Sequence, residues 1–349
     1  MGNSGTKHVL FHEESLSKSP YRRIGAGFCG SIWAAESEEY GSHGPVVIKR
    51  EEGGTGRSLY NDFETHQHLL DTLEKCPLEL QSFLIPLCFD FVSRRYAGWK
   101  STRFLGRFPQ GYSPCNILIS ERIPAVPQDV RHMLVDRLCP KRLIDAIKAD
   151  KKNEDCLIRP YLGQRKQPRL ETGVVFFSLR NCPLHVNQME ELKLDITAYA
   201  TAMANALAFM HWSARIDAND VEFVLAPPSR DSQRSQFGPD VLGPHNLWLL
   251  DFDQCRSMSM NEFGVKHAAA AFLRNNPYYP RPGKEDGQDQ KLWAHFRTAF
   301  IEASTKIIHP NDNRVELPDM LMDMIEELTR KNKQPSNYLE ANLIHSAPL

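Results

Sequence analysis

Carboxylate side chains beside two short apolar stretches constrain this chain more than any other feature. The stretches are 223–225 (Phe-Val-Leu) and 247–250 (Leu-Trp-Leu-Leu), and both have the composition of β-strands. The four acids are Asp217, Glu222, Asp251 and Asp253. Because a strand fixes the direction of the residues at its ends, we expect these acids to face one cleft.

The overall composition is that of an ordinary globular protein. The chain has 349 residues, of which 41% are hydrophobic and 24% charged, and its formal net charge is −1. This charge gives no general reason to expect DNA or a membrane as a partner, and no apolar run reaches the roughly 18 residues of a membrane span. The eight cysteines form no C-x-x-C pair, so we expect reduced thiols, no structural zinc and a cytoplasmic location.

A glycine-rich stretch precedes a strand that ends in lysine. Residues 25–30 read G-x-G-x-x-G, and β-prone residues follow at 31–35 and, after a turn, at 46–49. A dinucleotide-binding fold would need a helix directly after the glycines. A plain hairpin with a surface lysine is one interpretation, but the order favours the small lobe of a kinase-like fold, with Lys49 in the cleft.

The next helix departs from the kinase pattern. Apolar residues recur at helical spacing over 58–75. The position of the glutamate that pairs with the kinase lysine is occupied by His66, and Asp62 lies one turn earlier. We therefore expect the ion pair of Lys49 to be altered or missing.

Periodicity and proline positions predict the remaining organisation. Strands are expected at 84–92 and 116–123, a hairpin at 156–163 and 173–179, and helices at 128–150, 189–212 (with Asp195 as an N-cap), 261–274, 288–308 and 317–331. The prediction is an α+β, protein-kinase-like two-lobed fold with a small β-rich N-lobe and a larger, mainly helical C-lobe. Its expected parts are a flexible lead-in (1–20), the N-lobe (21–125), the C-lobe (126–335) with a basic insertion at about 128–180, and a tail (336–349).

The acids fall on kinase positions, but with substitutions. Asp217 corresponds to the catalytic aspartate, Glu222 replaces the metal-binding asparagine five residues later, and Asp251-Phe252-Asp253 replaces Asp-Phe-Gly. Glu222 and Asp251 would be the ligands of Mg²⁺ if the protein were a kinase. The additional carboxylates repel phosphates, however, and suit a guanidinium or ammonium group equally well.

Local charge points to a second partner. Residues 131–170 contain eleven Lys or Arg and five Asp or Glu, a net charge of +6. Such a segment is either a solvated surface or a contact for an RNA backbone.

Several longer motifs resemble a fungal family of arginine-containing cyclodipeptide synthases. This former domain-of-unknown-function family is often labelled as zinc finger proteins. The similar motifs span about residues 20–310 and lie at 23–27 (RIGAG), 210–212 (MHW), 217–225 (DANDVEFVL), 250–256 (LDFDQCR) and 276–282 (NPYYPRP).

The resemblance implies a tRNA-dependent aminoacyltransferase of fungal secondary metabolism. Its partners would be two aminoacyl-tRNAs, one charged with arginine, and its product a cyclo-arginine-Xaa diketopiperazine. No metal or cofactor would be needed, because the tRNA ester is already activated. The implied catalytic residues are Asp217, Glu222, Asp251 and Lys49. The implied substrate-binding residues are Asp253, Asp220, Gly25, Gly27, Gly30 and Glu121. The implied tRNA-binding residues are Lys141, Arg142, Lys151, Lys152, Arg165, Lys166 and Arg169.

The same residues are compatible with two other function classes. A small-molecule kinase of the aminoglycoside or choline kinase type would use the same cleft with ATP and Mg²⁺. A non-catalytic pseudokinase-like module would use it only for binding. The identity of the second amino acid, any covalent aminoacyl-enzyme and the oligomeric state are not predicted.

Overall fold

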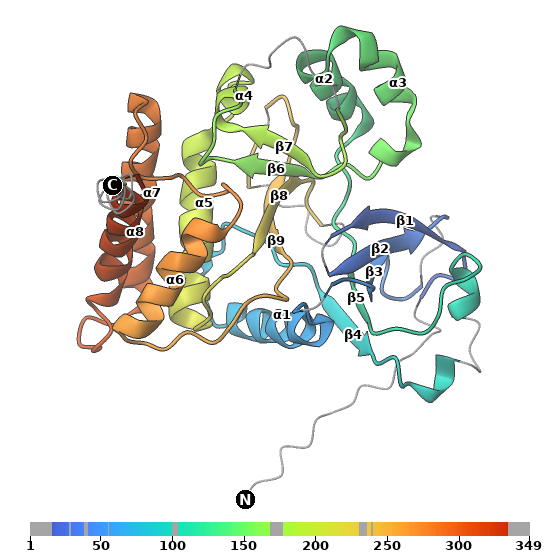
Figure 1. Cartoon of the computed structure of the whole chain (residues 1–349), viewed down its shortest axis with the longest axis horizontal. Helices are drawn as coiled ribbons and strands as arrows, with labels where there is room; N and C mark the ends of the chain where they lie inside the picture. The colour runs from blue at the N-terminus through green and yellow to red at the C-terminus, as the bar shows by residue number, and fades with distance from the viewer. Residues whose placement is uncertain are drawn as a thin grey trace, which may run out of the picture.

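The computed structural model describes residues 16–27, 29–37, 41–54, 56–99, 104–167, 177–229, 236–238 and 240–333. A β-rich N-terminal part precedes a larger, mainly helical C-terminal part (Figure 1). This confirms the predicted α+β fold class. Most of the expected lead-in and the whole expected tail lie outside the described residues. In the described part, no helix combines the length and apolar character needed to cross a bilayer.

Five antiparallel strands form the N-terminal sheet. The strands are β1 (Tyr21–Ala26), β2 (Gly30–Ala35), β3 (Val46–Glu51), β4 (Cys88–Val92) and β5 (Ile117–Glu121), in the order β1-β2-β3-β5-β4. Along β3, Val46 and Ile48 are buried in an aromatic-rich core on one face. Because side chains alternate along a strand, Lys49 points to the opposite face, toward the C-terminal part.

Helix α1 (Leu59–Leu73) lies against this second face of the sheet. It begins after Ser58, whose side chain accepts a hydrogen bond from the backbone of Asn61. Leu59 packs with Leu118 of β5. The same helix buries two polar residues, Asp62 and His66, between the two parts of the chain.

A smaller mixed sheet lies on the C-terminal side of the cleft. Its strands are β6 (Ile158–Tyr161), β7 (Cys182–His185), β8 (Glu222–Ala226) and β9 (Asn246–Leu250), in the order β7-β6-β8-β9. The described residues do not form the predicted hairpin. Instead, β6 pairs in parallel with β7 and antiparallel with β8. Part of the expected second hairpin strand lies outside the described residues.

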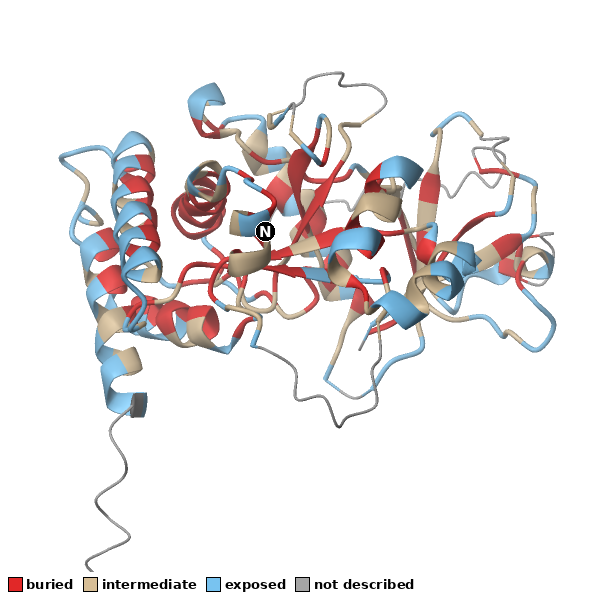
Figure 2. Cartoon of the chain, turned by 90° about the horizontal axis from the view of Figure 1, so that it is seen from above, coloured by how far each residue is buried: buried red, intermediate tan, exposed pale blue. Residues whose placement is uncertain are grey.

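Helices form the rest of the C-terminal part. They are α2 (Gln128–Leu138), α3 (Ile144–Ala149), α4 (Val186–Glu191), α5 (Ile196–Ala208), α6 (Glu262–Arg274), α7 (Gly287–Ile307) and α8 (Leu317–Lys333). Short 3-10 turns lie at Leu78–Leu80, Ala97–Trp99, Leu105–Arg107, Lys141–Leu143 and Lys151–Asn153. Figure 2 shows buried residues gathered on α5 and on the inner faces of its neighbours.

The helix expected at 189–212 is divided into three pieces. Lys193 has a positive φ of 56°, which ends α4, and Asp195 caps α5 as predicted by accepting a hydrogen bond from Ala198 N. A π-helical turn, Phe209–Ser213, then leads into the loop that contains Asp217. The apolar period identified the buried face, but not the break before Asp195.

Gly30 should be the least replaceable glycine of the glycine-rich stretch for stability. A Cβ atom at this position would lie 1.8 Å from the carbonyl oxygen of Arg50, whereas a Cβ at Gly27 would meet no atom within 4 Å. We expect Gly30→Ala to lower the free energy of unfolding by about 2–4 kcal/mol. Gly27→Ala, the matched control, should change it by less than about 1 kcal/mol. Equal urea midpoints for both variants would contradict the packing of β2 on β3.

Candidate functional site

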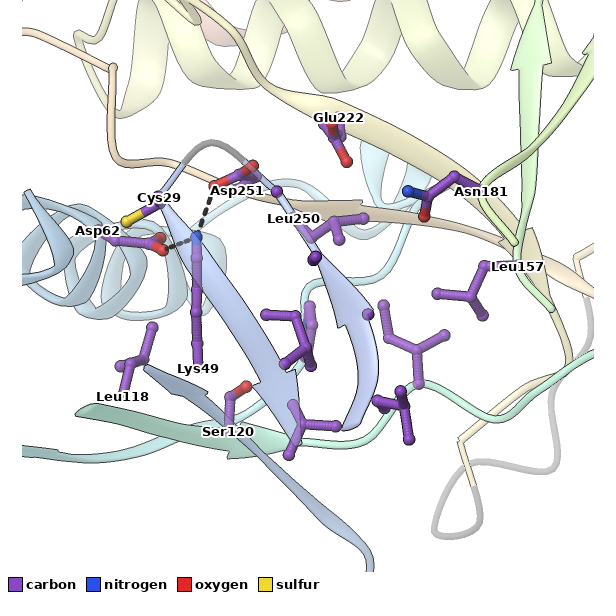
Figure 3. A pocket seen from close by; sticks show the side chains of 18 of the residues that line it. Cys29, Lys49, Asp62, Leu118, Ser120, Leu157, Asn181, Glu222, Leu250 and Asp251 are labelled. Atoms are coloured by element: carbon purple, nitrogen blue, oxygen red, sulfur yellow. Dashed lines mark hydrogen bonds and ion pairs between the residues drawn. The ribbon is translucent and has the colours of Figure 1, made fainter. Parts of the chain in front are cut away.

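A cleft of about 410 Å³ lies between the N-terminal sheet and the small C-terminal sheet. Charged side chains from α1, β3, β8 and the loop after β9 line the part of the cleft around Lys49, which we call its polar end (Figure 3). Apolar side chains also line the cleft: Figure 3 shows Leu118 close to Lys49 and Leu157 on the other side. The cleft therefore combines charged and apolar walls.

Lys49 stands at the centre of the polar end. Its Nζ atom lies 2.6 Å from Asp62 Oδ2 and 2.6 Å from Asp251 Oδ1 (Figure 3). Burial disfavours the charged amine, but the two carboxylates raise the pKa of Lys49 well above its usual value. The ion pair is thus altered, as predicted, and its helical acid is Asp62.

His66, at the kinase glutamate position, has a different environment. Its Nε2 atom lies 2.6 Å from the carbonyl oxygen of Pro86, and its ring packs edge-on against Phe252. Burial lowers the pKa of His66, which favours the neutral ring. The kinase spacing therefore identified the correct helix but not the acid one turn earlier.

The ion pair with Lys49 holds Asp251 in a defined position. It follows β9 directly and has a positive φ of 67°. The next residue, Phe252, donates its backbone N–H to Asp62 Oδ1 at 3.0 Å. Burial alone would raise the pKa of Asp251, but the adjacent Lys49 lowers it below its usual value. Asp251 therefore carries a negative charge in the cleft.

Glu222, at the start of β8, is paired with an arginine from β6. Arg159 Nη2 lies 2.5 Å from Glu222 Oε2, and both side chains are largely buried. Burial raises the pKa of Glu222 to about 7, an effect that Arg159 opposes and Asp251 reinforces. Glu222 can therefore exchange a proton near neutral pH, as a general base must. No motif or residue spacing indicated that Arg159 would face the cleft.

A third cation, Arg57, connects Asp220 and Asp253. Arg57, just before α1, places Nη1 2.7 Å from Asp220 Oδ2 and 2.9 Å from Asp253 Oδ1. Asp220 is partly exposed and lines the cleft with Arg57, whereas the Asp253 side chain is fully buried behind them. Burial and the nearby Asp251 raise the pKa of Asp253 above its usual value, although Lys49 and Arg57 oppose the shift.

Asp217 is turned away from this group. It is not among the residues that line the cleft, and its Oδ1 atom accepts backbone hydrogen bonds from Asn219 (3.1 Å) and Arg256 (2.9 Å). Burial raises its pKa, although these hydrogen bonds oppose the shift. In this arrangement Asp217 connects its loop to the segment after β9, and its catalytic role stays a prediction.

The other predicted substrate-binding residues lie along the cleft wall. Gly25, Gly27 and Gly30 all line it, next to Cys29. Glu121 also lines the cleft, and its carboxylate accepts hydrogen bonds from Leu87 N (3.0 Å) and Ser229 Oγ (2.7 Å).

Further charged contacts join the two walls of the cleft. Arg22 of β1 pairs with Asp155, and Arg122, just after β5, lies 2.5 Å from the same carboxylate. Asp155 belongs to the segment before β6, so it joins the two walls. None of these three residues was a predicted site residue.

The predicted tRNA-binding residues divide by position. Lys141, Arg142, Lys151 and Lys152 are exposed beside α3, and Lys166 is half-buried. Arg165 instead forms ion pairs with Glu190 (2.7 Å) and Asp289 (2.9 Å). Arg169 lies outside the described residues.

The donor set does not fit a metal site. The described residues contain no group of three or more His, Cys, Asp or Glu side chains that could hold a metal ion. The two carboxylates that a kinase reaction would require, Glu222 and Asp251, are paired with two different cations of the chain, Arg159 and Lys49. We therefore assign no step to Mg²⁺.

One known family matches part of this chain. The family model DUF3669, described as "Zinc finger protein", matches residues 247–312. This segment begins with β9 and includes Asp251, Asp253 and α6. Its single cysteine is Cys255, which is buried. No curated protein matches the chain.

One solved structure similar to this chain is the kinase domain of maize SIRK1, a sucrose-induced receptor kinase, bound to AMP-PNP. The sequence identity is 12% and the TM-score 0.30, and the match covers 92% of this chain and 83% of that chain.

The pKa of Glu222 predicts a measurable pH effect on stability. Because its pKa is higher in the folded than in the unfolded chain, the folded state binds more protons between pH 4.5 and about 7. Stability from this group is present at low pH and is lost as the pH rises through 7. The difference in unfolding free energy between wild type and Glu222→Gln should therefore fall over this window, by up to about 1.4 kcal/mol per pH unit. A difference that does not change with pH would contradict the assignment.

Proposed function

We propose that this protein transfers aminoacyl groups from tRNA esters, condensing an arginyl group with a second aminoacyl group into a cyclo-arginine-Xaa diketopiperazine. The observation that carries the proposal is the guanidinium of Arg57 between Asp220 and Asp253 at the acidic end of the cleft. A guanidinium is the group that a substrate arginine would bring, and these carboxylates already contact one.

The charges of the cleft agree with this substrate. Asp220, Glu222 and Asp251 all line it. The contacts described above use Asp251 Oδ1, Glu222 Oε2 and Asp220 Oδ2, so a ligand can approach the second oxygen of each carboxylate. An α-ammonium and a guanidinium are both favoured in such a field.

Glu222 is our candidate for the general base. It would remove a proton from the α-ammonium of one aminoacyl group, and the free amine would attack the ester carbonyl of the other. A C–N bond forms, the C–O bond to the tRNA breaks, and the second amine proton passes to the departing tRNA oxygen. A second attack of the same kind closes the ring and releases the other tRNA. The esters are activated before binding, so neither attack requires ATP.

The tRNA would lie over the exposed basic residues near α3. Lys141, Arg142, Lys151 and Lys152 belong to the segment with a net charge of +6 and are exposed. Phosphate contacts of exposed lysine and arginine side chains supply affinity without sequence specificity.

A second candidate function is phosphoryl transfer to a small molecule. The observation in its favour is the contact of Lys49 with Asp62, a carboxylate of α1, because kinases pair the corresponding lysine with a helix carboxylate when ATP is bound. The pairing of Glu222 with Arg159, at the position where kinases have a metal-binding asparagine, makes it the weaker candidate.

The proposed function is tested by incubating the purified protein with arginyl-tRNA and a mixed pool of aminoacyl-tRNAs. We expect mass spectrometry to detect a cyclo-arginine dipeptide whose formation needs no ATP, and Glu222→Gln to lower the rate by about 100-fold or more. If no cyclo-arginine product forms with any partner, the proposal is wrong. Phosphorylation of a small molecule by Mg²⁺-ATP would favour the second candidate.

Charge reversal separates the tRNA surface from the reaction centre. Lys151→Glu/Lys152→Glu should raise the KM for arginyl-tRNA by about tenfold or more. The KM of this variant should also depend less steeply on salt concentration than that of wild type. Lys291→Glu/Lys306→Glu, a matched pair of exposed lysines on α7, should leave KM unchanged. Equal KM values for the two variants would place the tRNA elsewhere.

A further inference from the structure

Resting on the proposed function, we propose that Arg57 is a built-in competitor that determines how strongly the cleft selects cationic substrates. Its guanidinium occupies the carboxylate pair Asp220–Asp253, and a substrate guanidinium reaches Asp220 by displacing it. Arg57 would thus be a specificity-determining residue: a ligand must replace its charge and its hydrogen bonds to bind.

The backbone around Arg57 is held in place, so its side chain can be replaced at the carboxylates by a ligand. The residue lies between Gly56, which has a positive φ of 87°, and Ser58, the N-cap of α1. The carbonyl oxygen of Gly56 is held by Gln254 Nε2 at 2.9 Å, and Ser58 is fixed by its capping hydrogen bond. The backbone on both sides is therefore anchored, and rotation of the long Arg57 side chain alone can vacate the site.

Exposure makes the exchange energetically possible. The Arg57 side chain is 20% exposed and that of Asp220 is 36% exposed, so solvent screens their contact. A buried pair would resist separation much more strongly. Exchange of one guanidinium for another also preserves the charge next to the fully buried Asp253, so the carboxylate is not left alone.

The exchange would give the cleft selectivity among cations, which the acids alone would not provide. Without Arg57, Asp220 and Asp253 would attract any cation, including ammonium groups and metal ions. Arg57 contacts both carboxylates through one nitrogen, Nη1. With Arg57 in place, a ligand competes only if it restores these hydrogen bonds, which a metal ion cannot do. A guanidinium has five N–H donors and an ammonium group three, so a guanidinium can restore them and still contact a further acceptor.

The test compares wild type with Arg57→Ala, using methylguanidine as the probe and methylammonium as the matched cation without the fork. We expect Arg57→Ala to melt at a lower temperature and to recover with methylguanidine in a saturable manner, but not with methylammonium. Wild type should bind methylguanidine at least about tenfold more weakly than the variant, because Arg57 competes for the site. Arg57→Ala/Asp220→Asn should lose the recovery.

Matched controls keep the result interpretable. Arg297→Ala also removes a guanidinium from a group of carboxylates, on α7 and α8 away from the cleft, and should show no recovery. If Arg57→Ala does not fold, Arg57→Gln replaces it with the same expectation. Equal stabilisation of wild type and variant by methylguanidine, or none of either, would overturn the inference.

A kinetic measurement separates this inference from the proposed function. With arginyl-tRNA, Arg57→Ala should lower KM about tenfold at an unchanged kcat, whereas a merely structural role would lower kcat or raise KM. Product formation with an unchanged KM would overturn the competitor role and leave the synthase proposal standing. Methylguanidine recovery in a protein that forms no product would support the competitor and count against the synthase.

Discussion

The contact of Lys49 with Asp62 and Asp251 is the interaction on which the rest of the cleft depends. It joins a strand of the N-terminal sheet, the helix behind it and the end of a strand in the C-terminal part. Asp62 also receives the backbone N–H of Phe252, so the loop after β9 has one defined path. Removal of the lysine would leave two carboxylates facing each other in a largely buried place, which is costly.

Two arginines compensate the charges of the other acids at the polar end. Arg159 compensates Glu222, and Arg57 compensates both Asp220 and Asp253. The polar end of the cleft is therefore an ordered set of opposite charges and not an uncompensated acidic pocket. In our proposal, binding of a cationic substrate is therefore an exchange of partners, in which the number and geometry of the N–H donors matter as well as the charge.

Part of this arrangement was predictable from local sequence. Glycine spacing and strand periodicity placed Lys49 correctly, because such patterns depend on neighbouring residues. Asp62 was missed because the kinase spacing pointed to His66, one turn further along the same helix. Arg57 and Arg159 could not be found from spacing, because their partners Asp220 and Glu222 are 163 and 63 residues away in the sequence. Arg159 meets Glu222 because β6 and β8 are neighbours in one sheet, and Arg57 meets Asp220 where the turn before α1 lies against the loop before β8.

The most direct test of the central claim is a crystal structure with an arginyl-adenosine amide, in which a stable amide replaces the tRNA ester. Our account predicts that the arginyl guanidinium lies against Asp220, that Arg57 has moved out of this position, and that the α-amine lies within hydrogen-bonding distance of Glu222. An arginyl group bound elsewhere, with Arg57 still between Asp220 and Asp253, would contradict it.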